Sequence, residues 1–106
     1  MKIVLDECLD VRIRFQFPEH ECVTAQYIKA KGLKDDQLLE LIDNNFDVLI
    51  TVDRSMRFQQ NLKKYPRLST ITISGCDGSL AHTLPFLSAI KGALKKMKPG
   101  QNIHIP

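Results

Sequence analysis

Two short apolar runs, each followed by an acidic residue, dominate the hydrophobic pattern of the chain. The first covers residues 2–5 and is followed by Asp6, and the second covers residues 47–52 and is followed by Asp53. Short apolar runs that are rich in β-branched residues are typical of strands buried on both faces of a parallel sheet. Ligands bind at the carboxyl ends of such strands, so the pattern indicates a functional site near the two acids.

Helical and extended patterns alternate along the rest of the chain. The helix expected from about residue 9 to 15 turns Leu9, Ile13 and Phe17 towards the core. A short strand is expected over 21–25, followed by an amphipathic segment over 25–33 that Gly32 closes. The next expected elements are a helix opened by residues 34–36 and closed by Asn44–Asn45, and a polar segment over 55–64 with one apolar helical face. The last are a strand over 68–73, a helix over 80–97 with Pro85 in its first turn, and an edge strand over 102–105. The strand over 68–73 alternates apolar and polar residues, which predicts one more exposed face. This order predicts one α/β domain, residues 1–106, with a largely parallel sheet flanked by helices.

Composition is typical of an ordinary globular protein. The 106 residues are 43% apolar and 25% charged, and no apolar run is long enough to span a membrane. The three cysteines lack the spacing of zinc ligands, so we expect reduced thiols in a cytoplasmic protein. The net charge of +3 permits a nucleic-acid partner without indicating one strongly.

Three acidic residues are candidates for one cation site at the carboxyl edge of the predicted sheet. Asp6 and Asp53 follow buried strands, and Asp35 opens the helix that leads into the second of these strands. The long connection before Asp35 leaves room for it to return to the edge that carries Asp6. Carboxylate oxygens are the ligands that Mg²⁺ and Mn²⁺ prefer, although an acid at each of these positions also suits a helix cap. Asp47 and Asp77 are interpreted as cap or turn residues.

Basic residues form two groups. Arg54 and Arg57 follow the second acidic strand end closely enough to contact a phosphate backbone. The other group, on one face of the last predicted helix, consists of Lys91, Lys95 and Lys98. Its simpler interpretation is a solvated face that also interacts favourably with the C-terminus of that helix.

Several segments resemble short, single-domain PIN-like proteins that are related to VapC-type toxin nucleases. The resemblance covers nearly the whole chain, and its motifs are residues 2–9, 32–39, 46–54, 58–62 and 84–87 through 98–100. It implies a PIN-like three-layer fold with a mostly parallel central sheet. It also implies a metal-dependent endoribonuclease site, with Mg²⁺ or Mn²⁺ as cofactor, and often a toxin–antitoxin context.

The resemblance matches Asp6, Asp35 and Asp53 to the acids of the family's site, so we expect these three to be the catalytic and metal-binding residues. The expected substrate-binding residues are Arg54, Ser55 and Arg57. Two departures weaken the match, because Ser55 stands where the family commonly has a second acid and Cys8 replaces an amide. A serine hydroxyl can hold a metal-bound water but adds no negative charge. The expected partners are RNA, an antitoxin protein and, in a homodimer, a second copy of the chain, with no membrane.

Two alternatives remain open at this point. The first is a catalytically weakened PIN-like module that binds nucleic acid or a partner protein, which the serine at position 55 favours. The second is a receiver-like or other doubly wound regulatory domain, which also gathers acids at strand ends. That domain needs a lysine at a late strand end, and residues 72–75 offer none.

Overall fold

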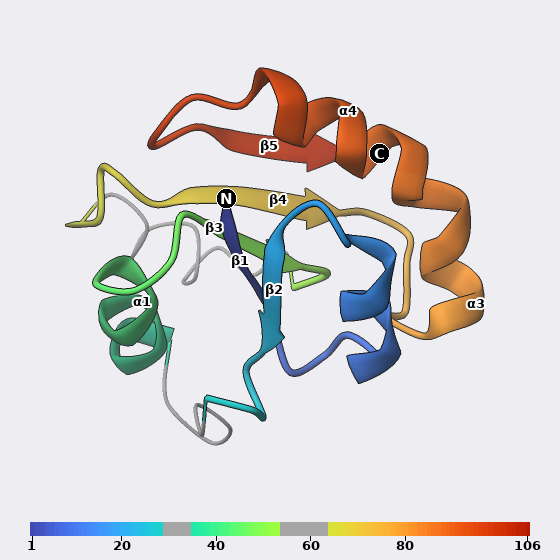
Figure 1. The fold of residues 1–106 in the computed structure, drawn as a ribbon, viewed down its shortest axis with the longest axis horizontal. Helices are drawn as coiled ribbons and strands as arrows, with labels where there is room; N and C mark the ends of the chain where they lie inside the picture. Colours follow the sequence, from blue (N-terminus) through green and yellow to red (C-terminus); the bar gives the residue numbers. More distant parts are fainter. Residues whose placement is uncertain (29–34, 54–63) are drawn as a thin grey trace.

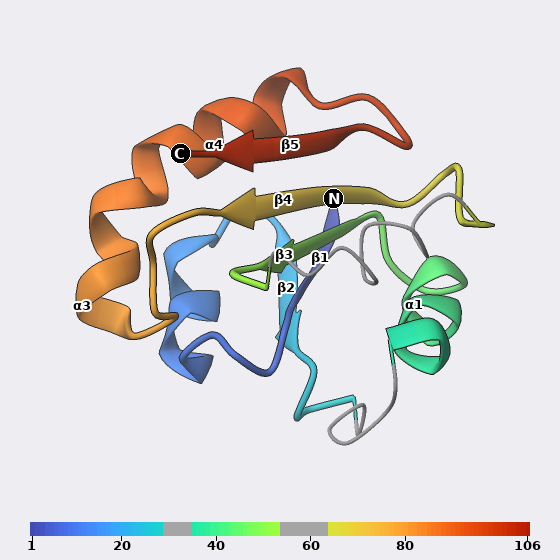
Figure 2. The ribbon, with the colours of Figure 1, turned by 180° about the vertical axis from the view of Figure 1, so that it is seen from behind.

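Five parallel strands form a single sheet in the order β2-β1-β3-β4-β5 (Figure 1). The computed structural model describes residues 1–28, 35–53 and 64–106, without the side chains of Asp35, Asp36 and Leu38. The strands are β1 (Lys2–Leu5), β2 (Glu21–Thr24), β3 (Val48–Thr51), β4 (Ser69–Ile73) and β5 (Asn102–Ile105). This arrangement confirms the predicted α/β class, and every strand pair is parallel. Figure 2 shows from behind that β5 lies at one edge of the sheet, beside β4.

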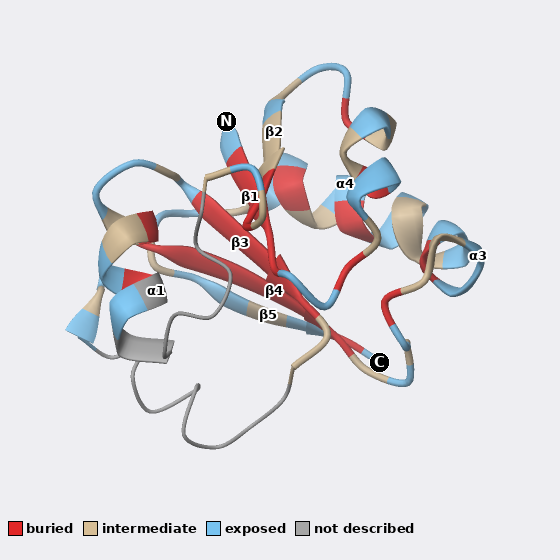
Figure 3. Ribbon diagram, turned by 90° about the horizontal axis from the view of Figure 1, so that it is seen from below, coloured by how far each residue is buried: buried red, intermediate tan, exposed pale blue. Residues whose placement is uncertain are grey.

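Helices cover both faces of the sheet. The described helices are η1 (Val11–Gln16), α1 (Asp35–Asp43), α3 (Leu80–Thr83), η3 (Leu84–Phe86) and α4 (Leu87–Lys96), of which η1 and η3 are 3₁₀ helices. Figure 3 shows the buried sheet between α1 on one side and η1 and α4 on the other. Within the described residues, no helix is both long enough and apolar enough to cross a membrane.

Alternating side chains of the strands build two separate cores, one on each face. Ile3 and Leu5 pack with residues of η1 and α4, whereas Val4, between them in β1, packs with Leu39 and Ile42 of α1. Successive residues of a strand point to opposite faces, and a strand that is covered on both faces has to be apolar throughout. The apolar runs of β1 and β3 are therefore explained by helices on both sides of the sheet.

The polar positions of β4 are not exposed, so the prediction of a more exposed face was wrong. All five residues of β4 are buried. The Thr70 hydroxyl donates to Asn102 Oδ1 at 2.8 Å, and the Ser69 hydroxyl donates to the Lys98 carbonyl at 2.9 Å. Hydrogen bonds of this kind offset the desolvation of a buried hydroxyl. Alternation alone could not reveal them because the acceptors, Asn102 and Lys98, are distant in sequence.

Two predicted helices differ from those observed. The single helix expected over 80–97 is interrupted, because Pro85 stands at the start of η3 and separates α3 from α4. The helix expected near residues 9–15 is the shorter η1, yet its three predicted core residues, Leu9, Ile13 and Phe17, are all buried. Of the amphipathic segment 25–33, residues 25–28 form a turn. Its remainder and the apolar helical face predicted over 55–64 lie outside the described residues, except at residue 64.

Gly78 holds two loops together at the carboxyl edge of the sheet. Its carbonyl accepts a hydrogen bond from the Asp10 backbone N–H at 2.8 Å. Its φ of +86° is unfavourable for other residues, and a Cβ at this position would lie 2.0 Å from the Cys8 carbonyl oxygen. The loop after β4 is therefore fixed against the loop after β1.

We expect Gly78→Ala to lower the free energy of unfolding by about 3–4 kcal/mol, because the two loops must separate to admit the methyl group. Gly75→Ala is the matched control, since Gly75 also has a positive φ but has no atom within 4 Å of the added Cβ. It should cost roughly 1–2 kcal/mol. Urea denaturation measures both, and equal losses would contradict the proposed contact between the loops.

Candidate functional site

The carboxyl ends of β1 and β3 lie side by side and bring two of the predicted acids to one edge. In the parallel register Leu5 is the partner of Ile50, and the Asp6 backbone N–H donates to the Ile50 carbonyl at 2.9 Å. Asp53 follows β3 by two residues. In a sheet of order 2-1-3-4-5, the chain turns in opposite directions from β1 and β3, and ligands bind in the crevice outside this switch point.

The Thr51 hydroxyl links the two strand ends. It donates to Asp6 Oδ2 at 2.7 Å and accepts a hydrogen bond from the Asp53 backbone N–H at 3.0 Å. The Cys8 Sγ atom lies 3.6 Å from the Thr51 hydroxyl oxygen. Sequence reasoning treated Thr51 only as a β-branched strand residue. The signal that could have revealed it is a hydroxyl side chain at the end of an apolar run, two positions before an acid.

Asp6 is a buried carboxylate without a basic partner among the described residues. It is 8% exposed, and its Oδ1 atom accepts a hydrogen bond from the Glu7 backbone N–H at 2.8 Å. Burial raises the pKa of Asp6, and the hydrogen bonds from Thr51 and Glu7 oppose that rise only in part. The ion pairs found in the described part of the chain involve other carboxylates. As far as the described residues show, the negative charge of Asp6 is therefore stabilised by hydrogen bonds alone.

The backbone brings the start of α1, where Asp35 lies, to the same side of the sheet as Asp6. After α1 ends, the Asp47 backbone N–H donates to the Lys2 carbonyl at the amino end of β1. The nine residues of α1 span about 13 Å, which is close to the length of a four-residue strand. The helix therefore begins towards the carboxyl edge, on the face where Leu39 packs against β1 and β3.

The structure describes only some of the other predicted site residues. Asp53 is half-buried. Arg54, Ser55 and Arg57 lie outside the described residues. No group of three potential ligands among His, Cys, Asp and Glu is found when the described side chains are searched, and the side chain of Asp35 is not one of them. Asp47 accepts a hydrogen bond from the Lys2 backbone N–H at the opposite edge, which confirms its interpretation as a turn residue.

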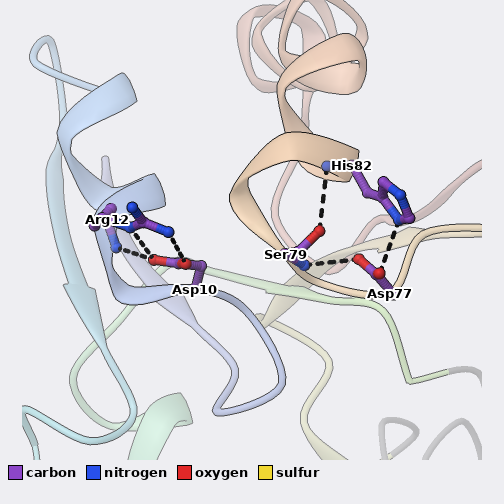
Figure 4. A network of polar contacts seen from close by, with 5 residues as sticks. All are labelled: Asp10, Arg12, Asp77, Ser79 and His82. Atoms are coloured by element: carbon purple, nitrogen blue, oxygen red, sulfur yellow. Dashed lines mark hydrogen bonds and ion pairs between the residues drawn. The ribbon is translucent and has the colours of Figure 1, made fainter.

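Two exposed ion pairs flank this edge (Figure 4). Asp10 accepts hydrogen bonds from the backbone and the guanidinium of Arg12, which lower the pKa of Asp10 to about 2. Asp77 accepts from the Ser79 backbone N–H, as expected of a turn residue, and lies 2.8 Å from Nδ1 of His82. The charge of Asp10 is thus balanced locally by Arg12, whereas no basic partner of Asp6 is found among the described residues.

Comparisons with known proteins leave the assignment at the level of the fold. No family model, no curated protein and no solved structure matches the chain significantly. The class defined by the structure is therefore a small α/β domain with a five-strand parallel sheet of order 2-1-3-4-5.

The raised pKa of Asp6 predicts a pH-dependent effect of Asp6→Asn in the presence of a chelator. Because ionisation of Asp6 is less favourable in the folded protein than in the unfolded chain, its contribution to stability falls as pH rises through the folded-state pKa. Asparagine stays neutral. We therefore expect the variant to be more stable than the native protein at pH 8, and the difference to vanish below the ordinary carboxyl pKa of 3.8.

Asp10→Asn is the control of opposite sign for this measurement. The lowered pKa of Asp10 means that its ionised form stabilises the folded protein above pH 3.8 and that this contribution is lost as pH falls towards 2. This variant should be less stable than the native protein at pH 8, with the gap closing in acid. Urea denaturation across this range tests both, and a stability loss in Asp6→Asn at pH 8 would refute the argument.

Proposed function

We propose that this chain is a PIN-like, Mg²⁺- or Mn²⁺-dependent endoribonuclease that hydrolyses RNA phosphodiester bonds. We further propose that it is the toxin-like member of a toxin–antitoxin pair. The observation that carries the nuclease proposal is the buried carboxylate of Asp6, tied through Thr51 to the backbone of Asp53 at the β1–β3 switch point. Support for the toxin context comes from the sequence resemblance alone.

The donor chemistry of the edge fits a hard divalent cation. Within the described part of the chain, the Asp6 carboxylate accepts hydrogen bonds from the Glu7 backbone, the Thr51 hydroxyl and the Cys8 thiol. A carboxylate has about four acceptor positions, so it can still coordinate a ligand. A buried anion without a basic partner is costly unless a cation neutralises it. Mg²⁺ and Mn²⁺ prefer oxygen ligands, and a bound ion would lower the pKa of a water molecule and stabilise negative charge on a phosphodiester.

In this proposal the residues of the chain position both the ion and the RNA. Thr51 fixes the orientation of the Asp6 carboxylate, so that little rotamer freedom is lost on binding. Asp35 and Asp53 complete the carboxylate set. Arg54 and Arg57 contact the phosphates of the substrate, and Ser55 holds a water molecule of the site.

RNA cleavage is the direct test of the proposed site. Asp6→Asn and Asp53→Asn should each lower the cleavage rate at least about 100-fold, since each removes a charged ligand that stabilises the transition state. A chelator should abolish the activity of the native protein. The rate is measured with a fluorescently labelled RNA in Mg²⁺ and in Mn²⁺.

The matched control is Asp47→Asn, because Asp47 lies at the opposite edge, where asparagine can still accept the hydrogen bond from the Lys2 backbone. It should retain nearly full activity. Cleavage that persists in both site variants would rule out this site, and cleavage that survives chelation would rule out a metal-dependent reaction.

Metal affinity distinguishes the nuclease from the weakened binding module. Ser55→Asp supplies the acid that the sequence lacks, so Mn²⁺ should bind about tenfold more tightly. Ser79→Asp is the control for added charge, since Ser79 caps α3 and aspartate is an equally good cap. Calorimetry measures both. No Mn²⁺ binding by the native protein at millimolar concentration would favour the binding module.

A further inference from the structure

A basic and aromatic surface lies away from the acidic edge, where η1 and the turn after it face α4. We call it the η1–α4 surface and define it by Arg14, Phe15, His20, Lys91 and Lys95. A cavity of about 140 Å³ lies between the turn and the two lysines, and its floor includes Phe17 and Pro18. A neighbouring hollow is lined by Arg14, Phe15 and His20, so the two form one continuous surface.

Phe15 presents its ring to solvent in a defined orientation. It is 67% exposed, although Ile13 and Phe17 on either side of it are buried. The burial of those two residues leaves the ring of Phe15 facing outward from η1. The guanidinium carbon of Arg14 lies over one face of this ring, 4.6 Å from its centre, which restricts the ring and places a positive charge on that face. A base would stack on the opposite face. An exposed aromatic ring next to a cation is a platform on which a nucleic-acid base can stack.

The lysines of α4 add further positive charge to this surface. Lys91 and Lys95 are exposed and four residues apart, whereas Ile90 and Leu94 are buried. The sequence of α4, LSAIKGALKK, contains no acid. In the described part of the chain neither lysine forms an ion pair, and Glu19 is the one acid that lines the cavity. This side of the molecule therefore attracts a polyanion.

We propose that the η1–α4 surface binds a single-stranded RNA segment, with a base stacked on Phe15 and phosphates against Lys91 and Lys95. The choice of RNA rests on the proposed ribonuclease function. The surface lies near the start of β2, because His20 immediately precedes that strand. A four-residue strand spans about 13 Å, so a strand of RNA bound here is roughly that far from the carboxyl edge and can extend to it.

Fluorescence anisotropy with a labelled oligouridylate tests this proposal. The measurement is made on Asp6→Asn in a chelator, so that binding is observed without cleavage. The double variant with Lys91→Gln and Lys95→Gln should make the slope of log K against the logarithm of the salt concentration shallower by about 1.4. Each of the two lysines neutralises one phosphate and accounts for about 0.7 of this slope. Phe15→Ala should weaken binding about 5- to 150-fold at constant salt, the range expected when one base no longer stacks on an aromatic ring.

The control is the double variant with Lys2→Gln and Arg67→Gln. It removes the same charge from two exposed residues that line other hollows, outside the η1–α4 surface. It should change the affinity far less than the α4 pair. Equal effects of the two pairs would reduce the binding to general charge attraction and overturn the proposal. An unchanged affinity in Phe15→Ala, with polyglutamate competing as well as RNA, would instead indicate an acidic protein partner.

The two proposals fail separately in these experiments. RNA binding that depends on Phe15 and the α4 lysines, together with no cleavage by the native protein, overturns the nuclease and keeps the surface. Cleavage that is unaffected by the Phe15 and lysine variants, together with unaltered binding, overturns the surface and keeps the nuclease.

Discussion

The parallel pairing of β1 with β3 is the constraint on which the rest of the structure depends. It places the residues that follow two strands distant in sequence at one edge, and the Asp6 backbone N–H extends the ladder by one hydrogen bond beyond β1. Thr51 then joins the side chain of Asp6 to the backbone of Asp53. A one-residue shift in this register would turn Asp6 to the opposite face and remove it from Thr51. The register that packs the core therefore also places Asp6 next to Thr51.

Burial of Asp6 acts against the stability that this pairing provides. A carboxylate in this position accepts hydrogen bonds but is largely removed from water, and the raised pKa shows that desolvation outweighs the hydrogen bonds. An apolar or amide side chain would avoid this cost. Natural proteins retain such a cost mostly where function requires it, and the pair of Asp10 with Arg12 shows that an acid at this edge can be balanced by a basic neighbour.

The elements that were predicted well are those whose signal is local. The apolar run of β3 and the period of α1, closed by two asparagines, are properties of a few consecutive residues, and both appear nearly where expected. The burial of β4 was missed because it depends on neighbours far away in sequence, which accept hydrogen bonds from the hydroxyls of Ser69 and Thr70. The position of Asp6 and Asp53 at one edge followed from strand polarity, whereas the hydroxyl of Thr51 between them depends on a register that sequence alone does not define.

The acidic edge and the basic η1–α4 surface lie apart on the molecule. If the substrate is a polyanion, the two regions have complementary roles. In the proposed nuclease, the carboxylates of the site would disfavour phosphates nearby until a cation is bound, and the net charge of the chain is only +3. In the same proposal, the exposed lysines of α4, which lie away from this edge, would hold an RNA strand without neutralising the carboxylates that would bind the ion.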